Sequence, residues 1–127
     1  MMDAAKIITR DELKRVIENK GSYVLIDVRE KEELAYGMIP TAKNVPLDEL
    51  ENALQMRADD FEKKYGFSKP GKNDRMIFHC RTGGRSARAT QIAHTQGFLN
   101  VQNYKGSIWD WSEIDPNVRK YGPTPVM

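Results

Sequence analysis

Two short segments with apolar residues at their centre constrain the fold of this chain most strongly. Residues 23–26 read YVLI and residues 75–79 read RMIFH. Neither run alternates with polar residues, and such runs are typical of strands covered on both faces, as in a parallel sheet. A helical pattern follows each run. This repeated order of strand and helix predicts an α/β domain with a mostly parallel sheet.

The remaining elements follow from shorter patterns. Strands are predicted at residues 6–8, 44–45 and 101–104, and helices at residues 30–36, 47–65, 86–96 and 108–111. Another helix is predicted to begin after Thr9, because Glu12 lies three residues later and completes a capping box, and to end at Gly21. Residues 113–127 are predicted to be a C-terminal tail, and the segment 121–125 is expected to be loose.

Composition narrows the class of protein. The chain has 127 residues, 39% hydrophobic and 30% charged, which suits one soluble domain with its own core. The net charge of +2 favours no nucleic-acid partner, and no apolar run is long enough to span a membrane. Acidic side chains such as Asp3 and Glu18 argue against a transit peptide. We therefore expect a cytoplasmic protein, with a mitochondrial address as the alternative.

The segment after the strand at residues 75–79 carries the expected chemistry. It begins with Cys80, the single cysteine, so an intrachain disulfide is excluded and this thiol is a candidate nucleophile. The residues that follow are expected to form an anion-binding loop: Arg81, Thr82, Gly83, Gly84, Arg85 and Ser86. Two adjacent glycines let the backbone curl so that N–H groups point inward, and the next helix adds the positive end of its dipole.

Such a loop favours the thiolate form of Cys80. A free cysteine has a pKa of about 8.5, and cationic surroundings or a helix N-terminus lower it to roughly 3.5–7.5. Arg81 and Arg85 would add positive charge. The same N–H groups would also stabilise the terminal sulfur of a persulfide. The structural alternative is a buried, inert cysteine, which the neighbouring arginines and glycines disfavour.

The spacing of the loop separates two kinds of chemistry. Four residues lie between Cys80 and Arg85, which makes the pattern C-x4-R. Phosphatases with a cysteine nucleophile characteristically have C-x5-R, because a tetrahedral phosphate needs a wider ring of N–H donors than one sulfur atom. The shorter loop therefore favours sulfur chemistry.

Several motifs together resemble the rhodanese family, the thiosulfate sulfurtransferases. The loop at residues 80–86 resembles the family's active-site loop. Residues 25–33 resemble its "D-V-R-x-x-x-E" segment, and residues 37–46 resemble "G-H-I-P-G-A-x-N-I-P". Residues 97–101 and 104–111 resemble "G-y-x-n-V" and "G-G-x-x-x-W". The similarity covers about residues 6–112 and is greatest to eukaryotic single-domain members, some described as thiosulfate:glutathione sulfurtransferases.

Departures from the family pattern are few. Met38 stands where the family commonly has histidine, and Thr41 where it has glycine. Gly106 and Ser107 replace the usual pair of glycines. The catalytic loop itself does not depart from the pattern.

The resemblance implies a fold and a mechanism. The fold would be a single rhodanese-like domain over residues 1–127, with a core at about 6–112 and about five mostly parallel strands flanked by helices on both faces. Cys80 would take sulfur from thiosulfate or from a persulfide donor and pass it to cyanide, glutathione or a thioredoxin-like protein. Covalent catalysis of this kind predicts ping-pong kinetics.

Other residues receive smaller roles. Asp27 and Arg29 follow the strand at residues 23–26 and would reach the same edge of the sheet as Cys80, where they would support the loop or form its rim. His79 precedes Cys80 on a strand, so their side chains should point to opposite faces. No cofactor is expected, and no metal site, because the histidines and the cysteine lack a sensible ligand spacing.

Two alternatives to a sulfurtransferase remain. One is a cysteine-dependent phosphatase or arsenate reductase on the same fold, against which the C-x4-R spacing weighs. The other is a noncatalytic sulfur carrier or redox-sensing module, which would need the same Cys80 and the same loop. The sequence does not separate this second alternative from an enzyme.

Overall fold

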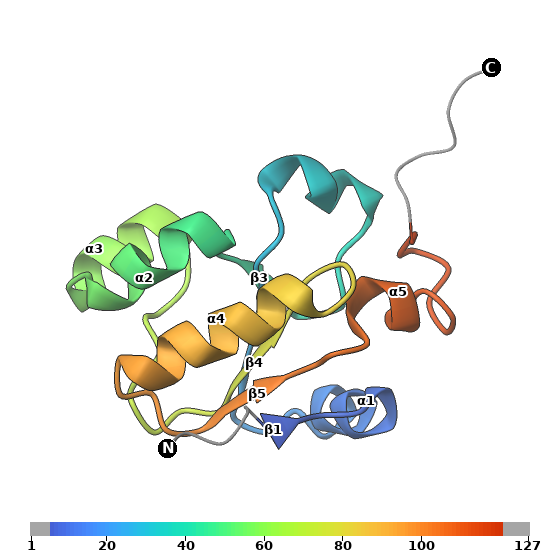
Figure 1. Cartoon of the computed structure of the whole chain (residues 1–127), viewed down its shortest axis with the longest axis horizontal. Coiled ribbons are helices and arrows are strands. Elements are labelled where there is room, and N and C mark those ends of the chain that lie inside the picture. The colour runs from blue at the N-terminus through green and yellow to red at the C-terminus, as the bar shows by residue number, and fades with distance from the viewer. Residues whose placement is uncertain (1–5, 121–127) are drawn as a thin grey trace.

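The computed structural model describes residues 6–120 and is drawn as a ribbon in Figure 1. The strands are β1 (Lys6–Ile7), β2 (Val24–Asp27), β3 (Lys43–Asn44), β4 (Met76–His79) and β5 (Val101–Asn103). The helices are α1 (Arg10–Asn19), the 3-10 helix η1 (Lys31–Tyr36), α2 (Leu47–Gln55), α3 (Ala58–Tyr65), α4 (Gly84–Thr95) and α5 (Ser107–Trp111).

All five strands form one parallel sheet in the order β1-β5-β4-β2-β3. From β2 the chain continues to β3, toward one edge of the sheet. From β4 it continues to β5, toward the other edge. The strand order therefore reverses between β2 and β4, and open α/β sheets bind ligands beyond the carboxyl ends of strands at such a point. The predicted α/β class and the parallel sheet of about five strands are confirmed.

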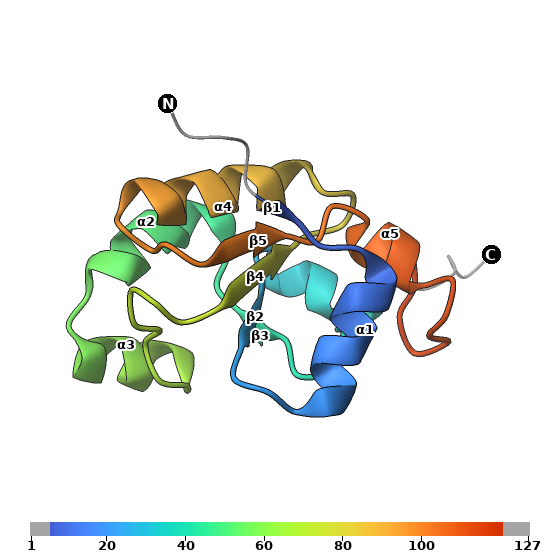
Figure 2. The same ribbon diagram turned by 90° about the horizontal axis from the view of Figure 1, so that it is seen from below.

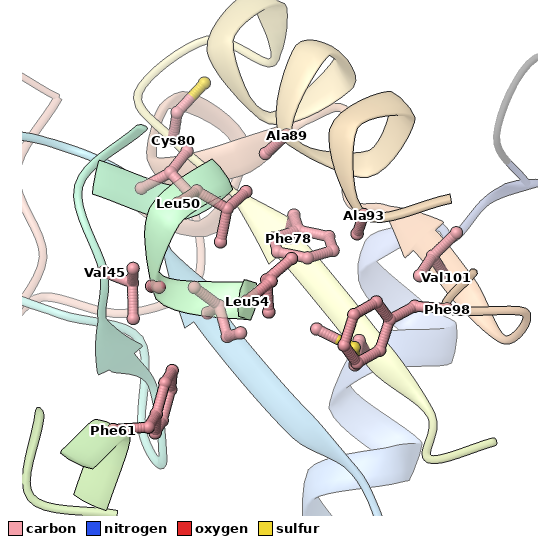
Figure 3. Packing of buried hydrophobic residues seen from close by; sticks show 14 residues of the cluster. Val45, Leu50, Leu54, Phe61, Phe78, Cys80, Ala89, Ala93, Phe98 and Val101 are labelled. Carbon is pink, nitrogen blue, oxygen red and sulfur yellow. The ribbon is translucent and has the colours of Figure 1, made fainter. Parts of the chain in front are cut away.

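Helices cover both faces of the sheet, as predicted (Figure 2). Helices α2, α3 and α4 bury one apolar cluster against it, in which Phe78 packs near Leu54 and Ala93 (Figure 3). Helices α1 and α5 bury a second cluster on the other face, built around Leu13, Ile77 and Trp111, for example. Because successive side chains of a strand point to opposite faces, β4 supplies both clusters.

The start of α1 agrees with the sequence prediction and its end does not. The Thr9 hydroxyl accepts the N–H of Glu12, and the Glu12 carboxylate accepts the N–H of Thr9, which completes the capping box. The helix ends at Asn19, and Lys20 rather than Gly21 takes the left-handed conformation, with φ of 53°. The predicted stop at Gly21 was therefore one residue late.

The single helix predicted for residues 47–65 is wrong, because the chain forms α2 and α3 there. Met56 and Arg57 are both extended, with ψ of 154° and 152°, so the helix breaks between the two segments. Acidic residues then occupy the first turn of α3, where their negative charges interact favourably with the positive end of the helix dipole. The break lets Phe61 reach the first apolar cluster, where it is fully buried.

Residues 113–120 pack against the domain. The side chain of Val118 is buried in the second cluster, and the N–H of Arg119 donates to the carbonyl of Tyr36. Residues 121–125, expected to be loose, lie outside the described residues. Within residues 6–120, no helix is long and apolar enough to cross a membrane. No group of three or more His, Cys, Asp or Glu side chains in that part of the chain could hold a metal ion.

Candidate active site

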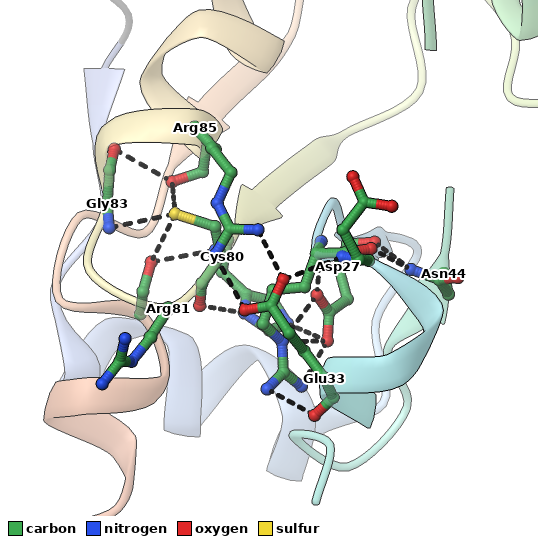
Figure 4. A network of polar contacts seen from close by, with 12 residues as sticks. Asp27, Glu33, Asn44, Cys80, Arg81, Gly83 and Arg85 are labelled. Carbon is green, nitrogen blue, oxygen red and sulfur yellow. Dashed lines mark hydrogen bonds and ion pairs between the residues drawn. The ribbon is translucent and has the colours of Figure 1, made fainter. Parts of the chain in front are cut away.

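Cys80 follows β4 directly and lies at the carboxyl edge of the sheet, below the start of α4 (Figure 4). Its side chain is 1% exposed. The N–H of Gly83 donates to the sulfur at 3.0 Å, and the hydroxyl oxygens of Ser86 and Ser107 lie 3.5 and 3.9 Å from it. Within the expected loop, the N–H of Gly83 therefore donates to the sulfur atom itself.

The curl of the loop depends on one of its two glycines. Gly83 has a φ of 98°, in the left-handed region that favours glycine. A Cβ at this position would also collide with the carbonyl oxygen of Lys105. Gly84 begins α4, has an ordinary φ and would accept a Cβ without contact. The sequence interpretation gave both glycines this role, and the structure requires only Gly83.

Hydrogen bonds control the ionisation of Cys80. Burial raises the pKa of this thiol, but the Ser86 hydroxyl and the N–H groups of Ser86, Gly83 and Thr82 lower it by more. The result is a pKa below the ordinary value, so the thiolate is favoured, as predicted. The physical cause is mainly the hydrogen-bonding loop, whereas the sequence interpretation also relied on the charges of Arg81 and Arg85.

Both arginines of the loop are engaged by other groups. Arg85 donates two hydrogen bonds to the Glu33 carboxylate, at 2.6 and 2.9 Å. This pair raises the pKa of Arg85 and lowers that of Glu33, and the charge of Cys80 is a weaker cause of the shift in Arg85. The Nε of Arg81 donates to the carbonyl of Lys120 at 3.1 Å, and its guanidinium lies 5.8 Å from the centroid of the Trp109 ring.

Asp27 and Arg29 form a buried ion pair and so support the loop from within the protein. Arg29 is 1% exposed, and its Nη2 lies 2.7 Å from Oδ2 of Asp27. The same guanidinium donates to the carbonyl oxygens of Glu33 and Gly37, at 3.3 and 2.8 Å. Arg29 therefore fixes the segment that carries Glu33, and Glu33 in turn holds Arg85 (Figure 4). Of the two roles considered for this pair, the geometry fits support and not the rim.

His79 and Cys80 point away from each other, as expected for neighbours on a strand. The His79 side chain is fully buried, with Nδ1 3.2 Å from the carbonyl oxygen of Cys80 and Nε2 3.6 Å from Oδ2 of Asp27. Burial lowers the pKa of His79, and the charge of Asp27 opposes this only in part. The neutral imidazole is thus part of the buried network under the loop.

Ser107 is a residue of the site that the sequence interpretation missed. Its hydroxyl accepts the N–H of Cys80 at 3.0 Å and donates to the carbonyl of Tyr104 at 2.9 Å. Its backbone is left-handed, with φ of 56°, which is unusual for a residue with a side chain. The available signal was its departure from the paired glycine of the resembled motif, and a glycine there would provide no hydroxyl.

The family model for the rhodanese-like domain matches residues 9–114, which include strands β2 to β5, the loop and the buried network. The chain belongs to the rhodanese family. Among rhodanese relatives, it is 47% identical over 106 residues to the rhodanese domain-containing protein CG4456 of Drosophila melanogaster, covering 83% of this chain and 95% of that protein. It is 39% identical over 113 residues to a human thiosulfate:glutathione sulfurtransferase, covering 88% of this chain and 97% of that protein.

A solved rhodanese structure agrees with the fold. The human single-domain sulfurtransferase TSTD1 superposes with a TM-score of 0.83 and 38% sequence identity, over 87% of this chain and 98% of that one. The resemblance to eukaryotic single-domain rhodaneses is therefore confirmed, as is the expectation of one rhodanese-like domain.

Proposed function

We propose that Cys80 carries sulfane sulfur as a persulfide from thiosulfate to a thiol acceptor, for which glutathione is the leading candidate. The chain is a sulfurtransferase of the rhodanese family. The observation that carries the assignment of Cys80 is its buried sulfur, which receives the Gly83 N–H at 3.0 Å and has the Ser86 hydroxyl 3.5 Å away. Groups in these positions stabilise an anionic sulfur.

In the first step, the Cys80 thiolate attacks the outer sulfur of thiosulfate. A new S–S bond forms to Cys80, and the bond between the outer sulfur and the sulfonate sulfur breaks. The electron pair of that bond leaves with sulfite, so the persulfide keeps one negative charge. The N–H of Gly83 donates to Sγ of Cys80, the atom to which the outer sulfur becomes bonded, and preorganised donors of this kind lower the barrier because they need no rearrangement.

In the second step, the acceptor thiolate attacks the outer sulfur of the persulfide. The S–S bond to Cys80 breaks, its electron pair returns to the Cys80 thiolate, and the acceptor leaves as a persulfide. A thiol such as glutathione fits this step because it supplies the second thiolate, which this one-cysteine chain lacks. A thioredoxin-like dithiol protein is the alternative acceptor, and any persulfide can replace thiosulfate as the donor.

The geometry disfavours the phosphatase alternative. The Gly83 N–H reaches the sulfur directly, so the loop encloses one atom and has no wider ring for a tetrahedral phosphate. Two carboxylates lie in the network beside the loop, and arginines hold both. Arg85 lowers the pKa of Glu33, which keeps this carboxyl ionised at neutral pH, and an ionised carboxylate cannot protonate a leaving group.

The test is a pair of measurements on the purified protein with thiosulfate. Mass spectrometry should show one added sulfur atom on Cys80, with one equivalent of sulfite released. Glutathione should then convert this single release into continuous turnover, with ping-pong kinetics. Cys80→Ser should lose both signals. A protein that forms the persulfide but never turns over with any acceptor would be a carrier or sensor, and one that hydrolyses aryl phosphates and ignores thiosulfate would be a phosphatase.

We also propose a cytoplasmic location, since a lone reactive thiol is best preserved in a reducing compartment. The mitochondrial matrix is the alternative. Fractionation of cells that express the tagged full-length protein distinguishes the two compartments.

A further inference from the structure

A groove of about 660 Å³ opens beside the catalytic loop, at the carboxyl ends of β1 and β5. Its walls include Ile7, Ile8, Arg10, Thr82, Lys105 and Trp109. Its size lies within the range of small-molecule sites, which is about 300–1,000 Å³. The function described above uses the Cys80 loop and leaves this groove without a role.

The groove and the catalytic loop share a wall. Thr82 lines the groove, and its N–H is one of the groups that lower the pKa of Cys80. Lys105 also lines the groove and lies against Gly83, since a Cβ on Gly83 would be 3.2 Å from Cγ of Lys105. A ligand in the groove therefore contacts the loop at Thr82, the second residue after Cys80.

The charges in the groove leave one cation without a partner. Arg10 pairs with Asp110 at 3.2 Å, and Glu113 pairs with Lys120 at 2.6 Å. Lys105 is exposed and has no hydrogen bond or ion pair within residues 6–120. The rest of the wall is largely apolar, with Ile7 57% and Trp109 38% exposed. The groove therefore suits a ligand with apolar methylene groups and one net negative charge.

We propose that this groove binds the acceptor thiol, glutathione, with one of its carboxylates on Lys105 and its thiol directed across Thr82 toward the Cys80 persulfide. Glutathione has two carboxylates and one ammonium group, so its net charge of about −1 at neutral pH complements the one unpaired cation. The Arg10–Asp110 pair offers partners of both signs to the remaining charges. This proposal rests on the proposed function, because it names where the acceptor of that reaction binds.

The first test measures binding without turnover. S-methylglutathione keeps all charges of glutathione but cannot accept sulfur, and it would be titrated into the Cys80→Ser protein while Trp109 fluorescence is followed. Trp111, the second tryptophan, is 5% exposed and should respond less. Lys105→Gln should raise the Kd roughly three- to fivefold, the range of an exposed ion pair. Lys105→Arg should restore it to within about twofold.

Two further variants test the groove itself. Ile7→Glu places a negative charge on an exposed wall position and should weaken binding of S-methylglutathione. Lys63→Gln is the matched control, because Lys63 is an exposed lysine on α3, which lies at the far end of the molecule from α5 (Figure 2). It should leave the Kd unchanged.

The second test uses the active protein. Lys105→Gln should raise the KM for glutathione by the same factor, while kcat and the KM for thiosulfate with cyanide as acceptor stay unchanged. Weakened binding in both variants without any sulfur transfer by the parent protein would support the groove and refute the proposed function. Absence of S-methylglutathione binding, or binding that neither Lys105→Gln nor Ile7→Glu weakens, would overturn the groove proposal even if thiosulfate is consumed.

Discussion

The hydroxyl of Ser107 accepts the backbone N–H of Cys80 at 3.0 Å, although the two residues lie 27 positions apart in the chain. Ser107 begins α5 with a left-handed backbone and is fully buried. A non-glycine residue in this conformation costs about 1–3 kcal/mol and persists only where its surroundings hold it. Its contacts with Cys80 and Tyr104 provide such surroundings, so α5 helps to set the position of the loop that begins at Cys80.

Substitutions at Ser107 can distinguish the cost of its backbone strain from the contribution of its hydrogen bond to Cys80. Ser107→Gly should relieve the strain but leave the buried N–H of Cys80 without its acceptor, which costs about 1–3 kcal/mol. We expect kcat for sulfur transfer to fall about tenfold. Ser107→Ala should be less stable than Ser107→Gly in urea, by about 1 kcal/mol, because alanine keeps the strain. Equal stability of the two variants would show that the left-handed backbone carries no cost.

The hydrogen bonds to Cys80 predict a pH profile. Because its pKa is lowered, the rate of alkylation by iodoacetamide should reach half its plateau below pH about 8.5, the value for a free cysteine. At pH values below that midpoint, the alkylation rate should decrease because the thiol becomes protonated. Ser86→Ala removes a hydroxyl that stabilises the thiolate, so its midpoint should shift upward. Ser68→Ala, at an exposed loop position, is the control and should match the parent protein.

Arg85 should affect this midpoint less than Ser86 does. Its guanidinium is held by Glu33, with side chains 35% and 23% exposed. We expect Arg85→Ala to shift the alkylation midpoint upward by less than Ser86→Ala. Urea unfolding should show a loss of at most about 1 kcal/mol, because solvent screens a pair that is this exposed. A midpoint shift as large as that of Ser86→Ala would return the main role in thiolate stabilisation to the arginine.

The buried pair of Asp27 and Arg29 should be the most sensitive part of the network. Arg29→Met would leave a buried carboxylate without its partner, so the free energy of unfolding should fall by about 3–5 kcal/mol. Replacing both residues by apolar ones, as in Asp27→Leu with Arg29→Met, should cost less than Arg29→Met alone. Urea unfolding of the variants measures this, and additive losses would mean that the two charges do not interact.

His79 predicts how stability depends on pH. Its pKa in the folded protein is below the ordinary 6.5, chiefly because the ring is buried. The unfolded chain therefore binds more protons between these two pKa values, and linkage makes stability rise with pH in that window. The contribution of His79 to the free energy of unfolding should be fully present above pH about 6.5 and should decrease as the solution is acidified. The measurement is urea unfolding at pH 5 to 7.5. In His79→Asn, the free energy of unfolding should lack the part of the pH dependence that His79 causes.

The sequence by itself determined the elements whose signals are local. The apolar runs before Asp27 and Cys80, the capping box of Thr9 and the spacing of the loop each depend on a few neighbouring residues, and they led to the fold class and to the candidate nucleophile. Backbone preference and side-chain periodicity act over such short distances, so the printed order of residues is enough to recognise them.

Only the tertiary structure determined which residues, distant in the sequence, contact these local elements. Arg85 meets Glu33 across 52 positions, and Cys80 meets Ser107 across 27. The break between α2 and α3 likewise lets Phe61 reach a core built from distant segments. Contacts of this kind depend on where packed helices and strands bring side chains in space, and packing can override helix propensity at a given residue. Local pattern therefore predicted the candidate nucleophile Cys80, and only the packed domain determined which groups surround its sulfur.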